Sequence, residues 1–210
     1  MALPAKKANF TLADKKADAS AWFTQLRDEI CDAFEAIEDE VAPRKGLIGK
    51  FERKTWDREG GGGGEISLMR GQVFEKVGVN ISTVHGTFSD DFKSQVRGAE
   101  EDGAFWASGI SLVAHMRNPH IPAAHLNTRF VCTSQNWFGG GGDLTPVLPD
   151  VGATTDFHAA LRAVCDKHDP EYYDKYKPKE VVEQEFFGRK MQIISKNTIL
   201  ILRLQTHHQQ

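Results

Sequence analysis

The sequence predicts an α+β fold built around an antiparallel β-sheet. Three observations lead to this prediction. An amphipathic helical pattern runs from about Ser20 to Val41, β-prone segments then follow one another between residues 47 and 134, and helical periodicity returns from Thr154. Consecutive strands joined by short turns pair antiparallel, because a parallel pair needs a long crossover connection.

The composition is that of a soluble globular protein, and it excludes several classes. The 210 residues suffice for one domain with a core, and the hydrophobic and charged contents are 40% and 26%. A net charge of -3 excludes general nucleic-acid binding, since no basic stripe is present to neutralise phosphates. The three cysteines are too scattered for disulfides or a zinc site and are expected to be buried thiols. No secretory signal or apolar run of membrane-spanning length is present, so we expect no membrane span and a cytoplasmic location.

The first expected element is a long helix. Residues 1–17 are polar and are expected to be loose, so Ser20 is predicted to be the N-cap and Pro43 to mark the end. One apolar stripe recurs at steps of three and four residues and comprises Phe23, Leu26, Ile30, Phe34, Ile37 and Val41. The acidic residues between them are interpreted as the solvent-facing side; they are Glu35, Glu38, Asp39 and Glu40.

The strands are expected next. Residues 47–70 are interpreted as a strand, a five-glycine loop from Gly60 to Gly64, and another strand. Longer strands are predicted at 73–86, 105–116 and 123–134, the last two joined by the turn "RNPHIP". A second glycine run, Gly139 to Gly142, is expected to be a flexible loop. Neither run has the phosphate-loop pattern.

Helices are expected after the sheet. Phe157, Leu161 and Val164 form a stripe from Thr154 onward, and "PEYYDKYK" is predicted to open another helix. Residues 178–210 differ in character and include the β-prone run "TILILRL", which is an aggregation liability when exposed. The predicted organisation is therefore a domain over 1–177 and a divergent tail over 178–210.

Polar residues of unusual type occupy two of the predicted strands. Alternation places Ser111 and His115 on one face of their strand and His125, Asn127 and Arg129 on one face of the next, with Leu126, Thr128 and Phe130 opposite. If the strands are neighbours, these five polar side chains form one patch. A plain solvent-facing surface is the alternative. The residue types and the nearby turn and glycine run favour a pocket floor instead.

The chemistry of the patch favours an anionic ligand. Arginine forks bind carboxylates, so Arg117 and Arg129 are candidate ligand contacts. His115, His125 and His158 are candidate proton donors or metal ligands, although their spacing matches no zinc signature. Asp143 is a candidate base, or an acceptor for a ligand N–H group.

Several long motifs resemble the oxygen-dependent coproporphyrinogen-III oxidase family. They are, in order, "GGGGGEISLMRGQVFEKVGVNISTVHG", "ASGISLVAHMRNPHIPAAHLNTRF", "WFGGGGDLTPVLP" and "FHAALRAVCDKH". The resemblance covers about residues 15 to 177. One departure is Met116, which stands where the family usually has proline.

The resemblance implies a reaction and an architecture. The substrate is coproporphyrinogen III, and two of its propionates undergo oxidative decarboxylation to vinyl groups, which gives protoporphyrinogen IX of haem biosynthesis. Dioxygen accepts the electrons, no organic cofactor is needed, and a divalent metal is claimed for some members and doubted for others. The implied fold is a large, flat antiparallel sheet with helices on both sides, in a homodimer.

The resemblance also implies roles for individual residues. His125 is expected to be the proton donor, and Asp143 to hold pyrrole N–H groups. The expected substrate contacts are Ser111, Asn127, Thr128, Arg129 and Arg117. His115, His125 and His158 are the implied metal ligands, if a metal binds.

The family's C-terminal motifs are not found after "YYDKYK", so the domain is expected to be incomplete at its C-terminus and to fold poorly. An inactive homologue that only binds tetrapyrrole, or pairs with a full-length subunit, therefore stays open as an alternative. A histidine-metal hydrolase unrelated to porphyrins is a third hypothesis.

Overall fold

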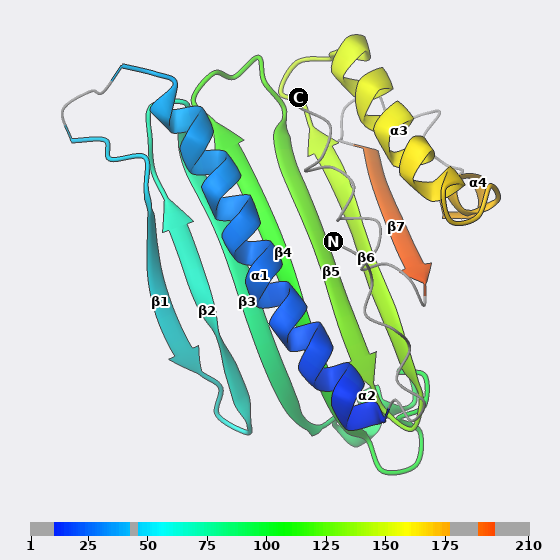
Figure 1. Ribbon diagram of the computed structural model, residues 1–210. Helices are drawn as coiled ribbons and strands as arrows, with labels where there is room; N and C mark the ends of the chain where they lie inside the picture. Colours follow the sequence, from blue (N-terminus) through cyan, green and yellow to red (C-terminus); the bar gives the residue numbers. More distant parts are fainter. Residues whose placement is uncertain (1–10, 43–45, 177–188, 196–210) are drawn as a thin grey trace.

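The computed structural model describes residues 11–42, 46–176 and 189–195, which form one antiparallel sheet with accompanying helices (Figure 1). The sheet has seven strands in chain order: β1 (Phe51–Asp57), β2 (Gly62–Met69), β3 (Phe74–Thr87), β4 (Ala104–Met116), β5 (Ala123–Cys132), β6 (Asn136–Thr145) and β7 (Arg189–Ser195). The helices are α1 (Leu12–Asp39), α2 (Asp90–Lys93), α3 (Val151–Asp166) and α4 (Tyr172–Tyr176).

Every pair of neighbouring strands is consecutive in the chain and antiparallel. The α+β class and the antiparallel sheet are thus confirmed. The predicted pairing of the two histidine-bearing strands is also confirmed, because β4 and β5 are neighbours. None of the helices in the described part of the chain is long and apolar enough to cross a membrane.

Helix α1 begins eight residues before the predicted N-cap, at Leu12 rather than after Ser20. Thr11 and Asp14 form a capping box in which the Thr11 side chain accepts from the Asp14 amide and the Asp14 carboxylate accepts from the Thr11 amide. The residues that follow are rich in alanine and lysine, which favour helix. The prediction of a loose segment was therefore wrong for residues 11–17.

Helix α1 crosses one face of the sheet diagonally and covers the core (Figure 1). Phe23 and Leu26 are fully buried against apolar side chains of β3, β4 and β5. These sheet residues are Val77, Val79, Ile110, Leu112 and Phe130. Burying such side chains stabilises the fold by about 1.5–3 kcal/mol each.

The C-terminal turn of α1 departs from the predicted stripe. Ile37 and Val41 are exposed, whereas Glu38 is only 4% exposed. The Glu38 carboxylate accepts hydrogen bonds from the backbone N–H groups of Gln72, Val73 and Phe74, at 2.7 to 3.0 Å. The interpretation of Glu38 as a solvent-facing residue was wrong, because the β2–β3 turn presents three donors that need an acceptor.

Both glycine runs contribute to strands rather than forming only loops. Gly62, Gly63 and Gly64 belong to β2, and Gly139 to Gly142 lie within β6, paired with β5 on one side and β7 on the other. The prediction of a flexible loop at residues 139–142 was therefore wrong. The backbone ladders on both sides supply the hydrogen bonds that hold this glycine segment extended.

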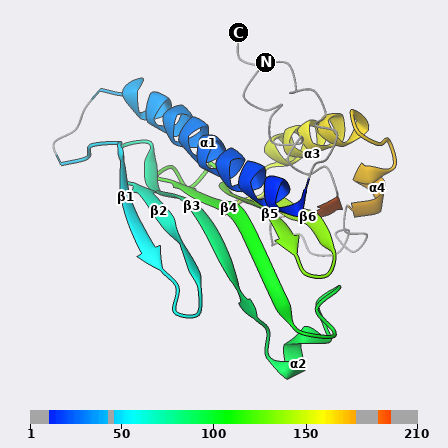
Figure 2. The same ribbon diagram turned by 60° about the horizontal axis from the view of Figure 1, so that its bottom comes forward.

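Helices α3 and α4 pack on each other beside the β6–β7 edge of the sheet (Figure 2). Helix α3 starts at Val151 after the N-cap Asp150, three residues before the predicted start. Figure 2 shows α1 on one face of β1 to β5, and no described helix lies over the opposite face. The second helical layer that the family resemblance implies is thus not seen among residues 11–42, 46–176 and 189–195. The run "TILILRL" lies outside these residues.

Candidate functional site

The face of the sheet opposite α1, here called the open face, carries the predicted polar residues. In the β4–β5 ladder Ser111 lies opposite Asn127 and Gly109 lies opposite Arg129. In the β3–β4 ladder Asn80 lies opposite Ser111. Directly opposite residues in adjacent strands point to the same face, so Asn80, Ser111 and Asn127 form one row across three strands.

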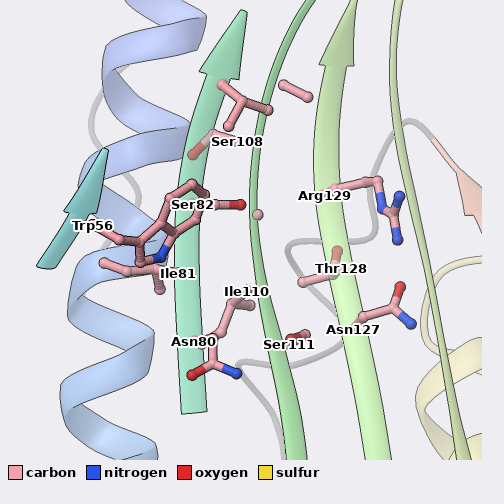
Figure 3. A pocket seen from close by; sticks show the side chains of 13 residues that line it. Trp56, Asn80, Ile81, Ser82, Ser108, Ile110, Ser111, Asn127, Thr128 and Arg129 are labelled. Carbon is pink, nitrogen blue, oxygen red and sulfur yellow. The ribbon is translucent and has the colours of Figure 1, made fainter. Parts of the chain in front are cut away.

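A pocket of about 310 Å³ lies on this open face, centred on β3 and β4 (Figure 3). Its open-face lining comes from four strands and comprises Trp56, Asn80, Ser82, Val84, Ala107, Gly109, Ser111, Asn127 and Arg129. In Figure 3 Trp56 marks the side of β1, and Asn127 and Arg129 mark the side of β5. The pocket is therefore apolar toward β1 and polar toward β5.

Small residues keep the pocket floor flat. Gly109 lies between Ser82 and Arg129, and a Cβ placed on it would be 2.9 Å from the Cβ of Arg129. Gly64 lies beneath Trp56, where an added Cβ would be 2.9 Å from the indole ring. Gly109 lines the pocket, and Gly64 lies beside it under the lining residue Trp56. A larger side chain at position 109 would fill the space, so the floor there fits a ligand with a flat face.

Arg129 supplies the charge of the pocket. It is the one charged residue among the lining residues in the described part of the chain, and its side chain is exposed. It makes no ion pair within 4 Å with another described residue. Its fork of donors is therefore available for a carboxylate ligand.

His125 and Asp143 form a hydrogen-bonded pair next to the pocket. They are opposite residues of β5 and β6, and Nδ1 of His125 lies 2.8 Å from Oδ2 of Asp143. The Asn127 amide Nδ2 lies 3.4 Å from Nε2 of the same imidazole, and Thr145 donates to the other Asp143 oxygen. Because the carboxylate engages Nδ1, Nε2 is the ring atom that can exchange a proton with a ligand.

His115 joins the same face, as predicted. Val113 lies opposite His125, and His115 follows Val113 by two residues on β4, so the two histidines are diagonal neighbours. Such neighbours have Cα atoms roughly 7–8 Å apart. His115 is exposed at the end of its strand. The predicted patch of Ser111, His115, His125, Asn127 and Arg129 is thus assembled on one face.

The implied metal set is not brought together. His158 lies on α3, where its Nδ1 is 2.8 Å from the Tyr173 hydroxyl, beside the far edge of the sheet. His115 and His125 lie on the open face of β4 and β5. Within the described residues no three His, Cys, Asp or Glu side chains are placed to hold a metal ion. His158 lies apart from the other two because helix packing, which spacing does not reveal, decides where α3 lies.

Two expected substrate contacts point elsewhere. Arg117 donates from Nε to the Gly71 carbonyl at 2.7 Å, which ties it to the β2–β3 turn. Arg129 pairs with Gly109, and Arg117 follows Gly109 by eight residues along the chain. The Cα atoms of Arg117 and Arg129 are therefore roughly 25 Å apart. Thr128 is 1% exposed and faces the α1 side, as its place in the alternation requires. Neither side chain reaches the row on the open face.

Two polar lining residues were missed in the sequence. Asn80 and Ser82 alternate with the buried Val79 and the partly buried Ile81 on β3. The same alternation that identified the β4 and β5 faces was present in "VGVNISTV", and it could have placed both residues on the open face. What the sequence did not reveal is that the pocket extends from β5 across β4 to β3.

The fold and site together define an α+β protein whose antiparallel sheet carries a flat, partly polar pocket on its open face. The family model for coproporphyrinogen III oxidase matches residues 18–190 of this chain. The chain belongs to that family.

Named relatives agree with this assignment. The oxygen-dependent coproporphyrinogen-III oxidase of Rickettsia bellii (strain OSU 85-389) is 60% identical over 159 residues, which is 75% of this chain and 57% of the relative. That of Rickettsia rickettsii (strain Sheila Smith) is 58% identical over 165 residues, covering 78% and 59%. The protein of the same name from Rickettsia felis is 60% identical over 163 residues, covering 77% and 58%. The chain therefore spans somewhat less than three fifths of the length of these relatives.

Proposed function

We propose that this chain provides the substrate floor and the proton-transfer pair of an oxygen-dependent coproporphyrinogen-III oxidase. The reaction converts two propionates of coproporphyrinogen III to vinyl groups and gives protoporphyrinogen IX. The observation that carries the proposal is that the His125–Asp143 pair and Arg129 lie on the open face of neighbouring strands. The pocket, with Gly109 in its floor, lies on the same face.

The pocket chemistry matches a tetrapyrrole with carboxylate side chains. The flat floor at Gly109 accommodates one face of a macrocycle. Arg129 binds a propionate, and the side chains of Ser111 and Asn127 add uncharged hydrogen bonds. A charge-assisted hydrogen bond of this kind contributes about 1.5–3 kcal/mol.

The positions of Arg129 and His125 along β5 suggest separate roles in substrate binding and proton transfer. Arg129, Asn127 and His125 share one face at two-residue steps, each roughly 7 Å long. Arg129 then holds one propionate while His125 faces another part of the ring. Asp143 orients the imidazole of His125, and Nε2 exchanges protons with the substrate at the reacting side chain.

The proposed stoichiometry needs only the substrate, dioxygen and a proton. Each reacting propionate loses its carboxylate as CO2 and one hydrogen from the carbon next to the ring, while the side chain becomes a vinyl group. The electron pair released passes to O2, which leaves as hydrogen peroxide after taking up that hydrogen as a proton together with one further proton. No organic cofactor enters, and no step is assigned to a metal because the implied histidine set is not assembled.

The test is substrate conversion by the purified chain. Coproporphyrinogen III is incubated with protein under air and under argon, and the products are oxidised to porphyrins and separated chromatographically. We expect dicarboxylic porphyrin under air alone, and its loss in His125→Ala. His85→Ala, an exposed histidine outside the pocket, is the matched control. Conversion that persists under argon would contradict an oxygen-dependent reaction.

A second candidate function is binding without turnover. It is favoured by one observation, the coverage of only 57–59% of the three relatives described above. In this case the chain binds coproporphyrinogen III through the same pocket but releases it unchanged under air, unless a full-length subunit is added. Binding together with conversion by the chain alone would exclude this alternative.

We also propose a homodimer that acts in the cytoplasm, on the strength of the family assignment. Light scattering after size-exclusion chromatography gives the mass directly. A mass of twice the 23.4 kDa of one chain supports the dimer, and a mass of one chain at micromolar concentration contradicts it.

A further inference from the structure

Asn80 lies on the pocket floor, where its side chain lowers the stability of the fold. Its side-chain oxygen is buried and has no hydrogen-bond partner among the described residues. A buried acceptor without a donor costs about 1–3 kcal/mol, and asparagine is also unfavourable in strands. The residues Val77, Val79 and Ile81, which alternate along β3 on the opposite face, are β-branched and suit a strand.

The position of Asn80 links it to the ligand pocket. Asn80 lines the pocket and lies opposite Ser111, which in turn lies opposite Asn127. Neighbouring strands are about 4.8 Å apart, so this row of amide, hydroxyl and amide spans about 10 Å of the floor. In Figure 3 the Asn80 nitrogen points toward Ser111 and the oxygen points away. Rotation about the terminal sp³–sp² bond exchanges the two atoms at low cost.

The pocket lacks a charged acceptor. No carboxylate is among the lining residues in the described part of the chain. Both oxygens of Asp143 already accept hydrogen bonds, one from His125 and one from Thr145. N–H groups of a ring lying on this floor therefore meet uncharged acceptors. Among the described residues that line the pocket, Asn80 and Thr128 each have a buried side-chain oxygen without a partner, and of these two only Asn80 faces the open side of the sheet.

We infer that Asn80 is a substrate-binding residue whose side-chain carbonyl accepts a hydrogen bond from a pyrrole N–H of the reduced macrocycle. This inference rests on the proposed function, because it takes its ligand from there. It gives the site a means to favour the reduced tetrapyrrole. The oxidised porphyrin carries the same carboxylates but fewer N–H groups, so Asn80 contributes less to its binding.

The experiment compares two probes by equilibrium dialysis under argon, where turnover cannot occur. The probes are coproporphyrinogen III and its oxidised form, coproporphyrin III, both quantified as porphyrin. Asn80→Leu removes the amide at similar size, Asn80→Ser keeps a small hydrogen-bonding group, and Asn136→Leu, at an exposed position outside the pocket, is the matched control. Thermal melts confirm that each variant is folded.

We expect Asn80→Leu to weaken coproporphyrinogen binding by about two- to twelve-fold, the loss of one hydrogen bond, while coproporphyrin binding stays within two-fold. Asn80→Ser should recover part of the loss, and Asn136→Leu should bind both probes like the wild type. Equal affinity of wild type and folded Asn80→Leu for coproporphyrinogen would overturn the inference. Equal weakening toward both probes would do so as well. Failure of the wild type to bind either probe is a different result, because it overturns the proposed function itself.

Discussion

Nδ1 of His125 and Oδ2 of Asp143 lie 2.8 Å apart across the β5–β6 ladder, where the two residues are direct partners. An ionised carboxylate can only accept, so it selects the imidazole tautomer with the proton on Nδ1. Asn127 approaches Nε2 on the other side of the ring, at 3.4 Å. We therefore propose that Nε2 is the atom that transfers the proton and that Asp143 orients His125.

Asp143→Asn should lower turnover much more than substrate affinity. An asparagine amide can donate to Nδ1 and thereby favours the other tautomer of His125. We expect kcat to fall by about 100-fold or more, the usual contribution of acid–base catalysis, with KM changed by less than about three-fold. Steady-state oxidation of coproporphyrinogen III measures both constants. Asp57→Asn on the exposed edge strand β1 is the control. A large rise in KM at unchanged kcat would instead show that Asp143 binds substrate.

Arg129→Lys should weaken binding of the tetracarboxylate ligand, whereas Arg117→Lys should not. Lysine keeps the charge at position 129 but loses the planar fork, so we expect about a ten-fold increase in Kd for coproporphyrin III. Arg117 is tied to the Gly71 carbonyl and lies far from the pocket, so its substitution serves as the matched control. Fluorescence titration gives both constants. Similar losses in the two variants would place a propionate near Arg117 as well.

Glu38→Gln should destabilise the fold without touching the pocket. The carboxylate accepts from the backbone N–H groups of residues 72 to 74, and an amide replaces one oxygen by a donor that faces those same N–H groups. We expect the free energy of unfolding to fall by about 1.5–3 kcal/mol. Urea unfolding followed by circular dichroism measures it. Glu40→Gln, the exposed neighbour, should change stability by less than about 0.5 kcal/mol.

The Cys31 thiol should resist alkylation until the protein unfolds. Burial raises the pKa of the Cys31 thiol from 9.0 to about 11, so almost no thiolate is present in the folded state at pH 8. The unfolded chain binds fewer protons at this site between about pH 9 and 11. The free energy of unfolding therefore falls as pH rises through that range. Iodoacetamide labelling read by mass spectrometry, with and without urea, tests the reactivity. Urea unfolding at pH 8 and at pH 10 tests the stability. In Cys31→Ala the free energy of unfolding should fall less between these two pH values than it does in the wild type.

The strand alternation was sufficient to find most of the candidate site. A side-chain period of two places Ser111 and His115 on one face of β4 and His125, Asn127 and Arg129 on one face of β5, whatever the neighbouring elements are. Short connections make consecutive strands neighbours, so the two polar faces meet. Asn80 and Ser82 obey the same rule, but they were not predicted to belong to the site, because the patch was predicted for β4 and β5 alone.

Other features depended on partners that are distant in the chain. The sequence pattern placed Glu38 on the solvent-facing side of its helix. The residue is buried instead, because its carboxylate accepts hydrogen bonds from three backbone N–H groups of the β2–β3 turn. The run Gly139 to Gly142 looked like a loop, yet β5 and β7 pair with it on both sides. Local propensity has no term for such contacts, so it assigned both wrongly.

The sequence by itself determined the α+β class, the consecutive antiparallel order of β1 to β5, the polar face of β4 and β5 and the family, because these follow from local periodicity and from long motifs. Only the tertiary structure decided that Asp143 pairs with His125, that His158 and Arg117 lie apart from them, and that the pocket reaches β3. The physical reason is that strand register and helix packing bring together residues from separate segments, and these depend on the whole set of contacts in the sheet rather than on any one segment.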